Sequence, residues 1–183
     1  MEYYRIVMTG FAGSFGAGLI AEKKEKQLLE RFPSFLIRNA VADGKKSVSF
    51  KETLLAMLKD LSFRYEIIGM TEAGDGGVFK GLWNLGEAAG LGFSVDLKSI
   101  PIKQETVEIC NFFDINPYQL YSEGVILLLA KDGDELADEL TKAGIPASAI
   151  GKTHFENKRV IVNDDEERFL EPRVGDSMVG IEE

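Results

Sequence analysis

One cysteine and one histidine are present in this sequence of 183 residues. Because Cys110 has no second cysteine to pair with, no disulfide can form within the chain, which favours a reducing compartment. Because His154 is the only histidine, a metal site with two histidines is excluded, and a serine–histidine–aspartate triad would have only one possible base. We expect Cys110 to be a buried apolar residue on a helix and His154 to lie at the surface.

The sequence also lacks a membrane segment and an excess of basic residues. Its longest apolar run, Val125–Ala130, is too short to span a bilayer, and residues 1–5 have none of the features of a signal peptide. The formal net charge is −9, whereas broad nucleic-acid surfaces need clustered lysine and arginine. We therefore expect a cytoplasmic, soluble protein that binds neither nucleic acid nor membranes.

The chain does contain a regular succession of strand-like and helix-like segments. The apolar run Val125–Ala130 is typical of a strand covered on both faces. We expect a turn at Asp43–Lys46 and a hairpin turn at Glu156-Asn157. The pattern predicts an α+β fold, a mixed β-sheet with helices on both faces, in one domain spanning residues 1–183. The expected strands are 5–9, 63–70, 93–97, 125–130, 149–155 and 158–162, and the expected helices are 17–32, 34–41, 50–61, 76–89, 103–113 and 134–143.

Two glycine-rich segments, Gly10–Gly18 and Thr71–Val78, each follow an expected strand and precede an expected helix. Glycine lets backbone N–H groups approach a ligand, and a helix start directs free N–H groups and a partial positive charge to the same place. Each segment is therefore a candidate phosphate site, although turns and helix caps alone would also explain the glycines. Neither has a Gly-Lys-Ser/Thr sequence or a secure dinucleotide fingerprint. The candidate ligand-binding glycines are Gly10, Gly13, Gly16, Gly74, Gly76 and Gly77.

Three carboxylates accompany these glycines. Glu72 and Asp75 flank the second segment, where their oxygens suit a Mg²⁺ ion bound to phosphate; alternatively, Asp75 caps the following helix. Glu123 stands with Gly124 at the beginning of the buried strand, where it would bind a ligand or lie exposed in a loop. We assign no set of protein metal ligands from the sequence.

The order of these segments resembles one known family. Gly10–Ile20 is similar to a Gly-x-x-Gly-x-x-Gly-x-x-Ile/Leu motif, and Glu72–Val78 to Asp-Pro/Val-Thr/Ser-Asp/Arg-Gly-Gly-Leu. Ile115–Pro117, Tyr121–Gly124 and Ala149–Gly151 resemble later elements of the same family. The family is the aminoimidazole ribonucleotide synthetase superfamily, of which the chain resembles the C-terminal domain. Its nearest likeness is to the hydrogenase expression/formation protein E branch.

The resemblance implies a particular role. Full-length members have two domains and use ATP to phosphorylate an amide or carboxylate-type oxygen, and the N-terminal domain supplies most acidic ligands and the dimer contacts. From the sequence we expect no counterpart of that domain and no counterpart of the hydrogenase branch's terminal cysteine in residues 179–183. Glu72 and Gly74 stand where the resemblance places the family's acidic residue and Thr/Ser.

The first hypothesis is therefore a stand-alone domain that binds ATP or another phosphate-bearing ligand with Mg²⁺ and is not catalytic alone. It would form a homodimer or pair with a separate N-terminal-type domain. The alternatives are a subunit of a split ATP-dependent synthetase and a structural or regulatory domain without a ligand. Whether the chain is an enzyme stays open.

Overall fold

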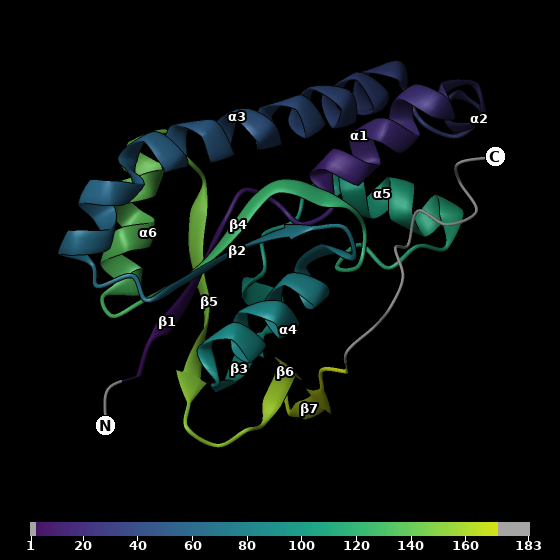
Figure 1. The fold of residues 1–183 in the computed structure, drawn as a ribbon. Coiled ribbons are helices and arrows are strands. Elements are labelled where there is room, and N and C mark those ends of the chain that lie inside the picture. Colours follow the sequence, from purple (N-terminus) through teal and green to yellow (C-terminus); the bar gives the residue numbers. More distant parts are fainter. Residues whose placement is uncertain (1–2, 172–183) are drawn as a thin grey trace.

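The computed structural model describes residues 3–171, which form a seven-stranded mixed sheet covered by helices (Figure 1). The strand order is β2-β4-β1-β5-β3-β6-β7, and all neighbouring pairs are antiparallel except β3 with β6. The strands are β1 (Arg5–Thr9), β2 (Gly69–Gly74), β3 (Gly92–Asp96), β4 (Ser122–Ala130), β5 (Ala147–His154), β6 (Arg159–Asn163) and β7 (Glu166–Phe169).

The helices lie on both faces of this sheet, which confirms the predicted α+β fold. In Figure 1, α3 crosses above the sheet, α6 stands at the left under the end of α3, and α4 lies below the sheet. Helices α3 and α6 pack on one face of β4 and α4 on the other, while α1 and α5 pack beside the first half of α3. The helices are α1 (Ser14–Lys23), α2 (Glu25–Leu29), α3 (Ser34–Arg64), α4 (Gly77–Ala89), α5 (Gln104–Phe113) and α6 (Gly133–Lys142), with a short 3₁₀ helix, η1 (Leu97–Ser99). No helix among residues 3–171 is both long and apolar enough to cross a membrane.

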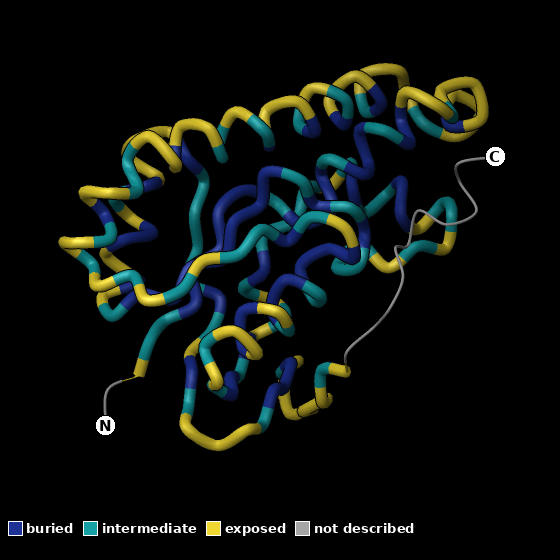
Figure 2. The backbone as a smooth tube through the Cα atoms, in the orientation of Figure 1, coloured by how far each residue is buried: buried dark blue, intermediate teal, exposed yellow. Residues whose placement is uncertain are grey.

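Strand β4 lies at the centre of the core, as its apolar sequence predicts. Leu127 and Leu129 point towards α4, whereas Ile126 and Leu128 point towards α3 and α6. The alternating side chains of β4 are therefore buried on both faces, and Figure 2 shows this central region as the most buried part of the molecule. Cys110 is likewise fully buried, on α5 as predicted, and burial raises the pKa of its thiol to about 12.

The predicted turn at Asp43–Lys46 is wrong, because one continuous helix, α3, spans Ser34–Arg64. Gly44 is a packing residue rather than a turn residue. A Cβ atom at Gly44 would lie 3.1 Å from the Ser14 carbonyl oxygen and 3.3 Å from the Gly18 Cα, so glycine lets α3 approach α1 closely. Since α3 also continues to Arg64, the strand expected at 63–70 begins only at Gly69.

The predicted hairpin at Glu156-Asn157 is also wrong. Strand β3 lies between β5 and β6, so Val95 faces Gly151 on one side and Ile161 on the other. Periodicity identified both strands but could not identify their partners. A further edge strand, β7, begins in the acidic run 164–167, directly after an exposed turn at 164–165.

Candidate functional site

The structure brings both glycine-rich segments against the same residue, Leu120, in the loop that precedes β4. A Cβ atom at Gly16 would lie 2.6 Å from the Leu120 Cγ, and one at Gly77 would lie 2.7 Å from the Leu120 carbonyl oxygen. Two segments about sixty residues apart in the sequence therefore meet through close backbone packing.

The first segment uses its amides to hold its own turn in place. Gly10 N–H donates to the Pro146 carbonyl (2.7 Å), and Gly16 N–H donates to the Tyr121 carbonyl (2.9 Å). Gly13 N–H donates to the Ser122 hydroxyl (2.9 Å), and Gly13 occupies the left-handed conformation (φ 67°) that precedes α1. These three amides are already bonded within the domain, so the ligand site must draw on other groups.

The second segment differs, because the start of α4 has amides without acceptors. Gly76 and Gly77 both have positive φ (80° and 68°) and lead the chain from β2 into α4. The Phe79 amide donates to the Tyr118 carbonyl (3.1 Å), but within residues 3–171 no acceptor bonds the amides of Gly77 or Val78. Such amides, at the positive end of a helix of 13 residues, are suited to an anion.

Asp75 does not cap α4, so that alternative prediction is wrong. Gly76 is the N-cap residue, and no side chain caps the helix. The Asp75 carboxylate instead accepts a hydrogen bond from the Lys80 ammonium (2.9 Å). The Lys80 stem folds back over Gly76, where a Cβ atom would lie 2.9 Å from the Lys80 Cβ. Sequence reasoning did not identify Lys80, whose side chain lies beside the start of α4. We call Gly76–Val78 and Lys80 the α4-start site.

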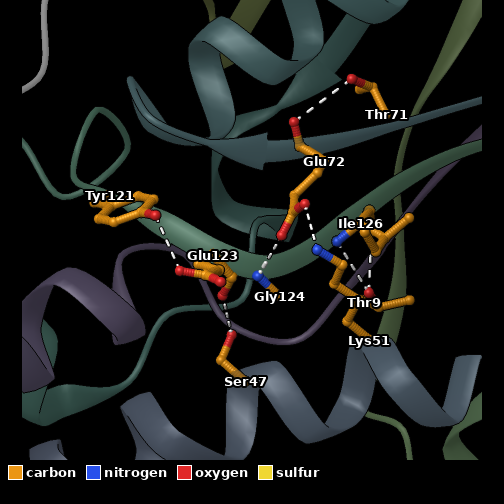
Figure 3. Close-up of polar contacts among 9 residues, drawn as sticks. All are labelled: Thr9, Ser47, Lys51, Thr71, Glu72, Tyr121, Glu123, Gly124 and Ile126. Atoms are coloured by element: carbon orange, nitrogen blue, oxygen red, sulfur yellow. Dashed lines mark hydrogen bonds and ion pairs between the residues drawn. The ribbon is translucent and has the colours of Figure 1, made fainter.

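Glu72 lies on the opposite face of β2, towards α3 (Figure 3). One carboxylate oxygen accepts from Lys51 Nζ (2.7 Å) and the other from the Gly124 amide (2.8 Å). Burial alone would raise the pKa of Glu72, but these two hydrogen bonds lower it below its ordinary value. Glu72 is therefore ionised and joins the edge strand β2 to β4 and to α3.

Glu123 and Gly124 form the beginning of β4 beside the same contact. The Ser47 hydroxyl donates to the Glu123 carbonyl oxygen (2.6 Å), while the Tyr121 hydroxyl donates to the Glu123 carboxylate (2.9 Å). Gly124 has φ 83°, and a side chain there would collide with the Ser47 carbonyl. The Ser47 and Lys51 side chains both approach from α3, as Figure 3 shows. We call Glu72, Lys51, Glu123 and Gly124 the carboxylate cluster.

The candidate residues thus form two groups, one on each face of the end of β2. Ala73 packs in the core with Val78 of α4, whereas its neighbour Glu72 contacts α3, as alternation along a strand requires. Gly74 ends the strand opposite Ser122, with φ 49°. Within the described part of the chain, no three histidine, cysteine, aspartate or glutamate side chains group as metal ligands would.

A cavity of about 470 Å³ adjoins the α4-start site, and sequence reasoning did not find it. It lies between α4, the loop at 116–119 and the strands β6 and β7. Gly76 and Lys80 line both this cavity and the α4-start site. Lys80, Tyr118 and Arg168 have no distinguishing sequence pattern, because only the fold brings their three segments together.

The family model described as AIR synthase related protein, C-terminal domain, matches residues 5–163. The chain belongs to this family. The predicted superfamily is thereby confirmed, while the assignment to the hydrogenase branch as a stand-alone domain stays a prediction. Residues 179–183, where the resemblance places a terminal cysteine, lie outside the described residues.

Solved structures similar to this AIR synthase related domain include HypE from E. coli, with a TM-score of 0.69 and 16% identity over 99% of this chain and 53% of that chain. HypE in complex with ATP has a TM-score of 0.63 and 16% identity over 92% of this chain and 50% of that chain. AaThiL complexed with AMPPCP and TMP has a TM-score of 0.58 and 16% identity, with the same two coverages.

At these identities the likeness shows the fold alone. The domain spans about half the length of the solved structures that it matches. A search of curated proteins finds no match.

Proposed function

We propose that this domain binds a phosphate-bearing small molecule or nucleotide at the α4-start site and is not catalytic by itself. The observation that carries the proposal is the pair of acceptor-free amides at Gly77 and Val78, beside the Lys80 ammonium. ATP with Mg²⁺ is the first ligand to test, because related proteins of the same fold are known in complex with ATP and AMPPCP.

The electrostatics at this place favour an anion despite the net charge of −9. The helix dipole, the unbonded amides and Lys80 are all sources of positive charge at the start of α4. The Asp75–Lys80 ion pair is largely exposed, with the Asp75 side chain 62% accessible, so it holds Lys80 only weakly. A phosphate that reaches the α4 start would replace Asp75 as the partner of Lys80. Mg²⁺ would enter with the phosphates.

A further protein surface, from a second copy of this chain or from another polypeptide, would complete the site. The proposal is supported by apolar side chains that are exposed at the end of α3 and along the edge strand β2 and would be covered on association: Phe63 (91%), Ile68 (47%) and Met70 (45%). The same observations support the alternative of one subunit of a split ATP-dependent enzyme.

Calorimetric titration of pyrophosphate and of MgATP into the protein and into Lys80→Gln tests the proposal. We expect Lys80→Gln to weaken the binding of both ligands about tenfold, because it removes one charge-assisted contact. Lys59→Gln, at an exposed position on α3, is the control and should bind as the parent does. Failure of the parent protein to bind either ligand would refute the phosphate site. Hydrolysis of ATP only after a partner is added would favour the split enzyme.

A further inference from the structure

The second half of α3 carries apolar side chains on its outer side, which Figure 2 shows as exposed over most of its length. Val48, Glu52, Leu55, Lys59 and Phe63 follow one another at intervals of three or four residues, so they share one face of the helix. Leu55 is 45% exposed and Phe63 is 91% exposed. We call these five residues the α3 outer stripe. Large apolar side chains along the solvent side of a helix indicate a contact surface.

The two charges of the α3 outer stripe differ from the other charges of residues 48–64. Those others form ion pairs within the domain: Lys51, Asp60 and Arg64. Glu52 and Lys59 form no ion pair with any residue of 3–171. They also cannot pair with each other, because seven residues separate them by about 10 Å along the helix axis. The stripe therefore presents one free charge of each sign, on either side of Leu55.

A second copy of this chain presents the complementary arrangement when its α3 runs antiparallel. In a two-fold contact the same surface of both copies meets, so every pairing occurs twice. An axis between Leu55 and the following residue sets Glu52 of each copy opposite Lys59 of the other, because both lie equally far from that axis. The same register sets Val48 opposite Phe63. A parallel pair in register would instead bring like charges together, which is unfavourable.

We propose that two copies of this chain associate through their α3 outer stripes, packed antiparallel about a two-fold axis. Burial of Leu55 and Phe63 supplies the affinity, and the pairs between Glu52 and Lys59 fix the orientation, because exposed ion pairs add little affinity. The contact from Val48 to Phe63 is only about 23 Å long, so we expect a weak dimer that depends on protein concentration. This inference goes beyond the proposed function, which leaves the partner open, and it does not rest on the phosphate site.

Sedimentation velocity over a range of protein concentrations, combined with a charge exchange, tests the proposal. Glu52→Lys and Lys59→Glu should each weaken the dimer about tenfold, because the two-fold axis turns one substitution into two like-charge contacts. The double variant Glu52→Lys/Lys59→Glu restores both pairs and should dimerise within about threefold of the parent affinity. Glu30→Lys makes the same charge change as Glu52→Lys at an exposed position at the end of α2, and it should leave the dimer unchanged.

Recovery of the dimer in the double variant would support the α3 contact. A parent protein that stays monomeric at millimolar concentration would overturn it. So would single variants that dimerise as the parent does, or a double variant no better than the single ones. Because α3 and α4 cover opposite faces of β4, sedimentation and pyrophosphate titration report on separate surfaces. Failure of the phosphate site would therefore leave the α3 dimer standing, and failure of the α3 dimer would leave the phosphate site standing.

Discussion

Replacing Gly124 with alanine should lower the free energy of unfolding by about 4 kcal/mol, or prevent folding altogether. Gly124 has φ 83°, a conformation that costs other residues about 1–3 kcal/mol, and its added Cβ atom would collide with the Ser47 carbonyl and lie 2.8 Å from the Val48 nitrogen. The colliding atoms are backbone atoms of α3, so relief requires α3 to move away from β4. Such a movement would also separate Lys51 on α3 from Glu72.

Gly144→Ala is the matched control for Gly124→Ala. Gly144 has nearly the same φ (88°), but no atom lies within 4 Å of its added Cβ. Gly144→Ala should therefore lower the free energy of unfolding by only about 1 kcal/mol, the cost of placing alanine in a left-handed conformation. Urea denaturation of both variants measures the difference. Equal losses of stability would show that Gly124 does not fix the contact between β4 and α3.

Gly77→Ala should lower the free energy of unfolding by about 3 kcal/mol and also abolish anion binding. Gly77 has φ 68°, and its added Cβ atom would lie 2.6 Å from the Tyr118 carbonyl and 2.7 Å from the Leu120 carbonyl. Since α4 begins at Gly77, moving this residue displaces the two amides that the site depends on. Thermal unfolding and pyrophosphate titration measure the two effects.

Gly90, at the other end of α4, provides the control for Gly77. Its φ is 65°, and no atom lies within 4 Å of an added Cβ. Gly90→Ala should cost about 1 kcal/mol and leave pyrophosphate binding unchanged. If Gly77→Ala kept full affinity for pyrophosphate, the anion site would lie elsewhere than the start of α4.

Sequence reasoning succeeded where a local pattern decides the outcome. Val125–Ala130 is apolar at every position, and only a strand between two helix layers buries such a run, which β4 does. The helix expected at 76–89 ends at Ala89 as predicted, and Gly90 adopts the left-handed conformation typical of a helix terminus. The family resemblance depended on the order of short motifs and did not require knowledge of their contacts.

Sequence reasoning failed where two distant segments decide the outcome. The residues around Gly44 are compatible with a turn and also with a helix in which glycine lets a second helix approach. Only the packing of α1 against Gly44 distinguishes these two structures. The hairpin expected at Glu156-Asn157 is ruled out because β3 occupies the place between β5 and β6. In both cases, the residues near the wrongly predicted turn do not show which distant segment packs beside them.

The same limit applies to the candidate site. The glycines and carboxylates were found because their types are distinctive. They divide into an α4-start site and a carboxylate cluster because Glu72 and Ala73, which are neighbours on β2, point to opposite faces of the sheet. The expected strand 63–70 does not contain these two residues, so it does not predict their alternation. Lys51, which binds Glu72, and Lys80, which covers Gly76, are ordinary helix lysines in the sequence. Only their positions in the fold distinguish them.

The most direct test of the account is an amide NMR titration of the protein with pyrophosphate. We expect the largest shifts at Gly77 and Val78, whose amides have no acceptor within residues 3–171, and small shifts at Gly13 and Gly16, whose amides are bonded to Ser122 and Tyr121. Largest shifts at Gly13 and Gly16, or no shift at Gly77 and Val78 at saturating pyrophosphate, would contradict a phosphate site at the start of α4.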